Sequence, residues 1–172
     1  MTEATVDRQP LERDRIAALY ESHAAAALRF AFLLIGRREA AEDVVHEAFL
    51  RVFGRFADRR SPDFFRPYLN RTIVNLVRSE QRRAGAERSK LPRLRTSGVH
   101  TDPNVDPRPD VVRALATLPV RQRAAIVLRY YEDLSEAQVA DIMRCSRPAV
   151  RSLVARGSES LRPLLEGLRH GI

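Results

Sequence analysis

The sequence has almost no cysteine, no tryptophan and no long apolar run. Its 172 residues include one cysteine, Cys145. A single cysteine excludes an internal disulfide and a cysteine-based zinc site. The longest uninterrupted apolar run, Phe30–Ile35, is far shorter than the ~18 residues that a membrane span requires. The N-terminus carries early acidic residues and lacks the apolar region of a secretory signal. We therefore expect a cytoplasmic protein without a membrane span.

The sequence also has little that supports catalysis or metal binding. The four histidines are scattered and none has H-E-x-x-H spacing: His23, His46, His100 and His170. There is no G-x-x-x-x-G-K-[ST] phosphate loop and no nucleophile elbow. His23 lies on an apolar helix face, where a core or boundary position is expected, and Cys145 is expected to pack as a small residue. We predict a protein that is not an enzyme and that binds no metal or cofactor; a nucleic-acid-processing enzyme is a distant alternative.

Positive charge is plentiful. The formal net charge is +8, and Lys90 is the only cation that is not an arginine. Both ends are basic, because residues 1–83 hold 15 basic and 12 acidic side chains and residues 111–172 hold 10 and 6. Arginine is suited to forked contacts with phosphate and guanine. This composition fits a nucleic-acid partner, and the alternative is a GC-rich genome that favours arginine codons. The 44% of hydrophobic residues supply enough apolar surface for a core.

Helical periodicity disappears between residues 84 and 110. This stretch is marked by prolines and glycines: Pro92, Pro103, Pro107, Pro109, Gly85 and Gly98. Such a composition predicts a flexible linker. On both sides, apolar residues recur at helical spacing. The predicted fold class is all-α, with two small helical domains (1–83 and 111–172) joined by a flexible, proline-containing linker (84–110), and a helix-turn-helix in the C-terminal domain.

Three helices are expected in the first domain. They span about 14–35, 38–57 and from near Pro67 onward, with Gly36 ending the first and a loop at 58–63 before the third. In the second domain, a short helix ends at Pro119 and another covers about 120–131.

The most diagnostic stretch of the second domain follows, from Leu134 to Val154. Ser135 and Gln138 have capping-box spacing, and Ser146 is placed to cap the next helix. Only a few residues, with Arg144 and Cys145 at the centre, separate the two helices. This arrangement predicts a helix-turn-helix.

Polar and small residues occupy the outward face of its second helix. They are Ser146, Arg147, Pro148, Arg151, Ser152, Ala155 and Arg156. A small, cationic face near a helix N-terminus is suited to a DNA major groove. The alternative is an ordinary pair of packed helices with solvated arginines.

The third helix of the first domain carries a second basic stripe. Arg71, Asn75, Arg78 and Arg82 lie at i, i+4, i+7 and i+11, and Arg83 extends the charge. This spacing fits a polyanion track, with phosphates on the arginines and Asn75 near a base edge. A solvated helix face is the alternative.

The second helix of the first domain carries acidic rather than basic side chains on the face opposite its apolar stripe. Away from its apolar stripe stand Asp43, Glu47 and Leu50, with His46 beside them. A leucine exposed among carboxylates is typical of a protein-docking face. Glu47 could instead simply pair with Arg51 at i+4.

At these residues the sequence resembles the extracytoplasmic-function (ECF) class of sigma factors, the small promoter-specificity subunits of bacterial RNA polymerase in the sigma-70 family. Residues 40–53 (AAEDVVHEAFLRVF) resemble the core-polymerase-binding helix, and 68–76 (YLNRTIVNL) the helix that recognises the minus-ten element. Leu118-Pro119 with residues 134–156 resembles the domain that recognises the minus-thirty-five element.

The resemblance implies a role for each surface. Asp43, His46, Glu47 and Leu50 would bind the β′ clamp helices of core polymerase. A loop that captures an extruded minus-ten base maps to 58–64, with Asp58, Arg59, Arg60, Ser61 and Phe64, and the stripe from Arg71 to Arg83 would hold the strands that separate. The resemblance further implies contact with the β flap, promoter DNA, an anti-sigma factor as a further partner, a monomer when free, and a nucleoid location in holoenzyme.

Two departures from the family pattern are visible. Arg144-Cys145 stands where the family often has glycine, and Phe53 and Tyr68 stand where it often has tryptophan. The alternative function is a stand-alone helix-turn-helix regulator whose first domain binds a ligand or dimerises. The α-helical surface at Asp43, Glu47 and Leu50 discriminates the two, because such a regulator needs no polymerase-docking face.

Overall fold

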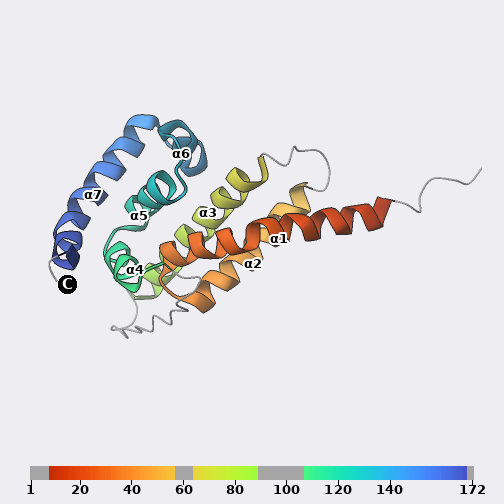
Figure 1. The fold of residues 1–172 in the computed structure, drawn as a ribbon, viewed down its shortest axis with the longest axis horizontal. Coiled ribbons are helices and arrows are strands. Elements are labelled where there is room, and N and C mark those ends of the chain that lie inside the picture. The colour runs from red at the N-terminus through yellow and green to blue at the C-terminus, as the bar shows by residue number, and fades with distance from the viewer. Residues whose placement is uncertain (1–7, 57–63, 89–106, 170–172) are drawn as a thin grey trace, which may run out of the picture.

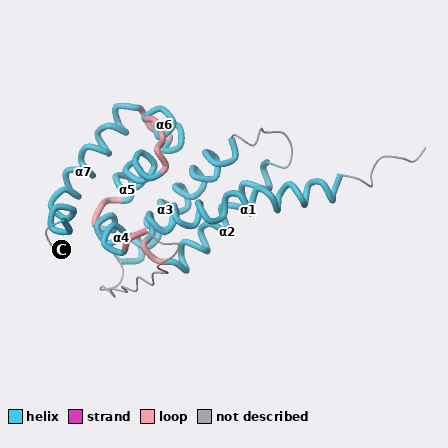
Figure 2. Tube along the Cα trace, viewed as in Figure 1, coloured by secondary structure: helices cyan, strands magenta, loops and turns pink. Residues whose placement is uncertain are grey.

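The computed structural model describes residues 8–56, 64–88 and 107–169, and within these ranges it contains helices and no strand. The helices are α1 (Arg8–Ile35), α2 (Arg38–Phe56), α3 (Phe65–Arg88), α4 (Pro109–Ala116), α5 (Val120–Ile126), the π-helix η2 (Val127–Tyr131), α6 (Glu136–Met143) and α7 (Arg147–Arg169). Figure 1 shows α1–α3 as one group and α4–α7 as a second group beside it, and Figure 2 marks the short loops between them. The all-α prediction is confirmed.

Some boundaries differ from the prediction. α1 begins at Arg8 rather than Asp14, and α3 begins at Phe65 and continues to Arg88. Residues 84–88 of the predicted linker are therefore helical, because no proline interrupts the helix before Pro92. At the other end of that linker, Pro109 occupies the first turn of α4, where its missing N–H removes no helical hydrogen bond.

The first domain is organised around a sharp turn and an aromatic cluster. Gly36 has φ +76° and its N–H donates to the carbonyl of Phe32 at 2.7 Å, which ends α1 as expected. Phe49 and Phe53 of α2 lie 6.0 and 5.7 Å from Phe65 of α3, measured between ring centroids. Such contacts favour a particular packing angle between α2 and α3.

The second domain contains the predicted helix-turn-helix, α6 and α7. The helix predicted over 120–131 changes from α to π geometry at Val127. Asp133 (φ 52°) then reverses the chain before α6. Arg144, at the end of α6, also has a left-handed backbone (φ 51°). It thus adopts without glycine a conformation that glycine most often supplies.

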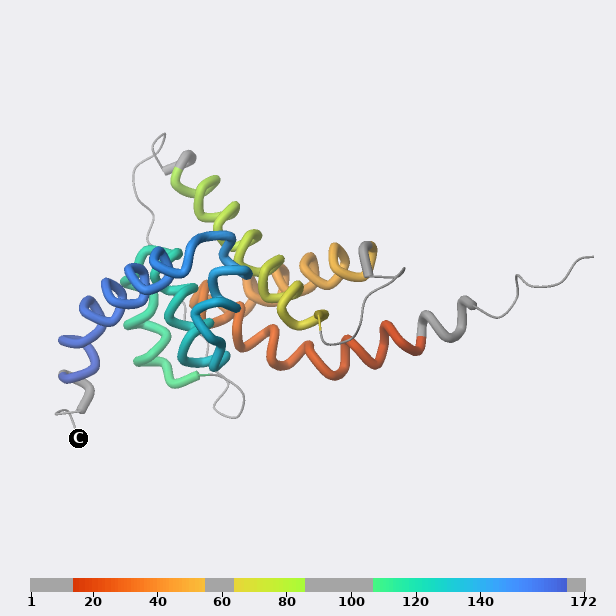
Figure 3. The backbone as a smooth tube through the Cα atoms, turned by 90° about the horizontal axis from the view of Figure 1, so that it is seen from above, coloured from red at the N-terminus to blue at the C-terminus, as the bar shows by residue number. Residues whose placement is uncertain are grey.

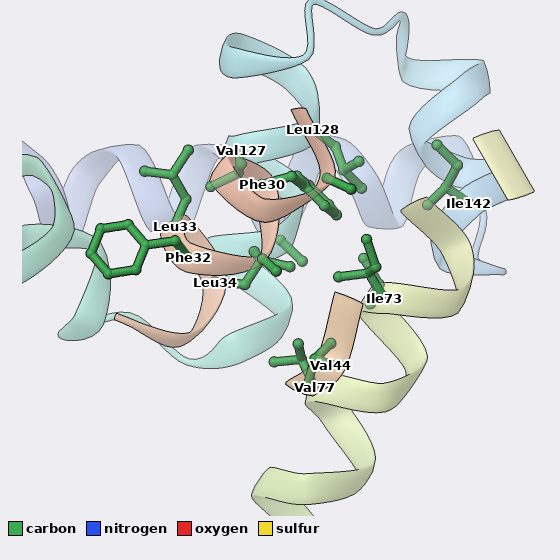
Figure 4. Packing of buried hydrophobic residues seen from close by; sticks show 14 of the residues in the cluster. Phe30, Phe32, Leu33, Leu34, Val44, Ile73, Val77, Val127, Leu128 and Ile142 are labelled. Carbon is green, nitrogen blue, oxygen red and sulfur yellow. The ribbon is translucent and has the colours of Figure 1, made fainter. Parts of the chain in front are cut away.

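The two domains share one hydrophobic core, which the sequence did not predict. Figure 4 shows side chains of α1, α2 and α3 meeting side chains of η2 and α6 in a single cluster; among those labelled are Phe30, Leu34, Val44, Ile73, Val77, Leu128 and Ile142. Seen from above, α4–α7 gather at one side of the molecule, and α1 and α2 extend away from them toward the other side (Figure 3). The domains are therefore packed on each other, whatever path the undescribed residues 89–106 take.

One helix is long and apolar enough to cross a membrane by length and composition alone, at residues 14–35 of α1. Its most apolar residues, 30–34, are buried in the core just described. A core helix passes the same test, so the burial accounts for its composition.

Candidate nucleic-acid and polymerase interfaces

Local capping builds the helix-turn-helix. The Ser135 hydroxyl accepts the Gln138 N–H at 3.3 Å while the Gln138 side chain accepts the Ser135 N–H at 2.9 Å. This is the predicted capping box. The Ser146 hydroxyl accepts the Ala149 N–H at 3.3 Å, which confirms the cap on α7. Between the caps, Cys145 donates its N–H to the carbonyl of Ala140, so the turn is fixed by backbone bonds at both ends.

The predicted faces of α7 separate as expected. Val150 is fully buried, and Gly157 and Leu161 also face the core. On the opposite side, Ser146, Arg147, Pro148, Arg151 and Arg156 are exposed and Ser152 is half-buried. A cationic, solvent-facing helix surface is therefore present where the sequence placed it.

Two arginines of this face are held by neighbouring side chains. Arg151 donates from Nε to Glu136 Oε2 of α6 at 2.8 Å. The hydrogen bond to Arg151 is the main cause that lowers the pKa of Glu136, and the same bond raises the pKa of Arg151. Arg156 instead donates from Nη2 to the hydroxyl of Ser152 one turn earlier, at 2.6 Å. The orientation of Arg151 thus depends on a different helix, and that of Arg156 on its own.

The basic stripe of α3 is divided between solvent and the domain interface. Asn75, Arg82 and Arg83 are exposed and Arg78 is half-buried. Arg71 is also half-buried, because its Nη2 donates to the carbonyl of Asp141 in α6 at 2.7 Å. Its Nε is buried with no hydrogen-bond partner among the described residues. In this arrangement Arg71 contacts the helix-turn-helix domain.

A buried carboxylate joins the two domains beside Arg71. Glu132 has a side chain that is only 3% exposed, and its Oε2 accepts from Arg66 Nη2 at 2.8 Å and from Asn70 Nδ2 at 3.1 Å. Both donors belong to α3. Sequence reasoning missed this cluster; the available signal was Asn70, a polar residue next to Leu69 on the buried side of the helix.

Arg123 makes a second connection between the domains. It is 6% exposed, and its guanidinium donates to the carbonyls of Leu34 in α1, Ala116 at 3.1 Å and Leu118 at 2.9 Å. All three acceptors lie at or just beyond a helix C-terminus, where carbonyls carry partial negative charge. Burial lowers the pKa of Arg123 below its ordinary value.

The exposed face of α2 has the predicted chemistry. Asp43 and His46 are exposed, and Leu50 is 56% exposed. Glu47 accepts from Arg51 Nε at 2.6 Å, so the intrahelical ion pair is also present. This pair is compatible with docking, because both partners remain about half exposed. We call Asp43, His46, Glu47 and Leu50 the α2 surface.

The remaining predicted minus-ten residues lie mostly outside the described part of the chain. Asp58, Arg59, Arg60 and Ser61 are among the residues that the structure does not describe. Phe64, immediately before α3, is described and is 62% exposed. An exposed aromatic ring at this position fits base stacking.

An apolar groove is lined mainly by the second domain. It has a volume of about 440 Å³ and is lined by residues of α4, α5, η2 and α7, together with Leu33 of α1. Tyr130, Tyr131 and Leu165 at its edge are exposed. Among the described residues, no group of three or more His, Cys, Asp or Glu side chains could hold a metal ion.

Two segments of the chain match known family models. Residues 19–87 match the family model for sigma-70 region 2, and residues 109–161 match that for sigma-70 region 4. The first match contains α2 and most of α3, and the second contains the helix-turn-helix.

Two curated relatives are sigma factors. The chain is 33% identical over 162 residues to the ECF RNA polymerase sigma factor SigE of Mycolicibacterium smegmatis, covering 86% of this chain and 60% of that protein. It is 32% identical over 167 residues to the ECF RNA polymerase sigma factor SigL of Mycobacterium tuberculosis, covering 88% of this chain and 89% of that protein. The chain thus spans less than two thirds of the first relative and most of the second.

Solved structures share the fold. The sigma factor RpoE of Bartonella quintana, in complex with the anti-sigma factor NepR, superposes with a TM-score of 0.71 at 23% identity, covering 90% of this chain and 96% of that one. CnrH, in complex with the cytosolic domain of CnrY, superposes with a TM-score of 0.63 at 23% identity, covering 90% of each chain. At this identity the likeness concerns the fold.

Proposed function

Because this chain belongs to the ECF class of the sigma-70 family of RNA polymerase sigma factors, we propose that its α2 surface binds core polymerase while α3 and α7 bind promoter DNA. In this proposal α7 recognises the minus-thirty-five element through Ser146, Arg147, Pro148, Arg151, Ser152 and Arg156. The α3 stripe and Phe64 act at the minus-ten element. The family membership replaces the alternative of a stand-alone regulator.

One observation carries the proposal: a single chain exposes two surfaces of opposite chemistry. The α2 surface presents Asp43 and Glu47 around an exposed leucine, which repels phosphate and suits a protein partner. The outward faces of α3 and α7 present arginines, which suit DNA. A protein that must bind a polymerase and a template at once needs this separation of charge.

The proposed partners follow from the family and its relatives. They are the β′ clamp helices and β flap of core polymerase, promoter DNA and an anti-sigma factor. The last is supported by the solved structures of RpoE and CnrH, which hold NepR and CnrY. Binding of this kind needs no chemistry from the chain itself, so we propose a non-enzymatic factor. It would be monomeric when free, cytoplasmic, and located on the nucleoid when in holoenzyme.

The docking role is tested by a double substitution, Asp43→Arg with Leu50→Asp. Both residues are exposed, so the helix should fold, while Asp43→Arg reverses a charge on the α2 surface and Leu50→Asp removes its apolar contact. We expect the double variant to lose capture of core polymerase by the tagged full chain. Glu159→Arg reverses an exposed acid on α7 and is the matched control, expected to bind core polymerase as the wild type does. Normal capture by the double variant, with unchanged far-UV circular dichroism, would refute the docking role.

A further inference from the structure

The contact between Glu136 and Arg151 links the two helices of the helix-turn-helix on its solvent side. Glu136 is the first residue of α6, and Arg151 lies in the second turn of α7. They are 15 positions apart, yet Arg151 Nε lies 2.8 Å from Glu136 Oε2. The Arg151 side chain is 61% exposed and that of Glu136 is 33% exposed. The pair therefore sits at the edge of the proposed DNA-binding face.

Glu136 is itself held in place. Ser135 and Gln138 form the capping box on either side of it, so the backbone of the first turn of α6 is fixed. Its carboxylate also lies at a helix N-terminus, where negative charge is favoured. The hydrogen bond that lowers the pKa of Glu136 keeps the carboxylate ionised, as a charge-assisted bond requires.

The atoms used in this contact decide what Arg151 can still do. A guanidinium has an Nε side and an end formed by Nη1 and Nη2. Glu136 occupies the Nε side, and Nη1 and Nη2 of Arg151 make no hydrogen bond to another described residue. The two Nη groups form the end that can bind O6 and N7 of one guanine at the same time.

We propose that Glu136 is a positioning residue that orients Arg151, so that the Nη1–Nη2 end of the guanidinium recognises one guanine in the minus-thirty-five element. The inference rests on the proposed function and adds a specificity-determining residue to it. Arg156 is a contrasting case, because it is held by Ser152 of its own helix and lacks a carboxylate from α6.

The proposal predicts opposite changes in affinity and in specificity. Glu136→Gln removes a negative charge beside DNA, so affinity for DNA of any sequence should rise. The neutral amide holds the Arg151 guanidinium less firmly, so preference for guanine at one position should fall. A bidentate arginine–guanine contact gives roughly 5- to 150-fold discrimination, and we expect at least about a threefold loss of it. A residue that only supported the fold would lower affinity for all sequences alike.

The experiment uses the full chain assembled with core RNA polymerase. The complex is allowed to bind a pool of DNA duplexes that carry a randomised stretch, and the retained duplexes are sequenced. We compare wild type, Glu136→Gln, Arg151→Ala, the double variant and the control Glu159→Gln, an exposed acid-to-amide change on α7. Arg151→Ala should abolish the guanine preference at one position, and adding Glu136→Gln to it should change that preference no further, because Glu136 acts through Arg151.

The outcomes separate the inference from the function on which it rests. If the wild-type complex enriches no sequence element, the proposed recognition function fails. If the wild type enriches an element and Glu136→Gln keeps the full guanine preference, the positioning role is overturned while recognition stands. If Arg151→Ala keeps the guanine preference, the positioning role is overturned as well. A uniform gain of affinity with unchanged preference would show that Glu136 acts only as a charge.

Discussion

Replacing Arg123 by methionine tests the connection between the two domains. The substitution keeps an unbranched apolar stem but removes the donors to Leu34, Ala116 and Leu118. The bonds to Leu34 and Leu118 are buried and the bond to Ala116 is partly buried, so water cannot fully replace the guanidinium. A buried acceptor left without a donor costs about 1–3 kcal/mol.

The expected loss follows from these contacts. Removing the guanidinium also removes its own desolvation cost, which is visible in the lowered pKa of Arg123. We therefore take the lower end of the range for the three carbonyls and expect a decrease of about 3 kcal/mol in the free energy of unfolding. This is a large fraction of the 5–15 kcal/mol that is typical of a domain. The free energy of unfolding of Arg123→Lys should lie between those of the wild type and Arg123→Met, since one ammonium cannot reach three separated carbonyls.

Urea unfolding of the full chain, followed by far-UV circular dichroism, measures the effect. Because Leu34 belongs to the first domain, we also expect a broader transition as the domains begin to unfold separately. Arg121→Met is the matched control: it is an exposed arginine two positions earlier in α5 and should change stability by less than about 0.5 kcal/mol. If Arg123→Met were as stable as this control, the role given to the buried guanidinium would be wrong.

Two further predictions concern packing and pH. A Cβ at Gly157 would lie 2.6 Å from Ile126 Cδ1, so the Ile126 side chain must shift, and Gly157→Ala should gain no stability in urea unfolding, whereas Gly54→Ala on α2, with nothing within 4 Å, should stabilise by about 0.5–1 kcal/mol. Equal effects of the two changes would contradict the close approach of α5 and α7. Burial, and then the charge of Arg66, lower the pKa of His23. Protonation therefore favours the unfolded chain, and stability should fall as pH drops below the unfolded pKa of about 6.5. His23→Phe should lose this pH dependence in thermal unfolding at pH 7.5 and 5; an unchanged dependence would refute it.

The local features of the fold were predictable because each depends on a few adjacent residues. Ser135 and Gln138 stand at capping-box spacing, and Gly36 can adopt the left-handed turn that ends α1. The division of α7 into a buried and an exposed face likewise follows from its 3.6-residue period. These are short-range effects, so one sequence suffices to find them.

The packing of the domains was not predictable in the same way. Arg71 was placed on a DNA-binding stripe by its spacing, yet its side chain contacts a carbonyl 70 positions away. The acceptors of Arg123 are backbone carbonyls, so the identities of the side chains do not reveal them. The partners of Glu132 likewise lie more than 60 positions from it. Such contacts depend on how preformed helices meet in space, which a single-sequence periodicity does not encode.

The shared core also constrains any complex in which the whole α3 stripe contacts DNA. Arg71 is half-buried where α6 packs on α3, and its Nη2 donates to the Asp141 carbonyl, so full access of DNA to Arg71 requires α6 to move away from α3. That movement would break both hydrogen bonds to Glu132 and expose apolar side chains such as Ile142. The free energy for it must come from ligands that bind the separated domains more tightly than the packed ones. One chain that binds two DNA elements and a polymerase together gains enough binding free energy to separate the domains.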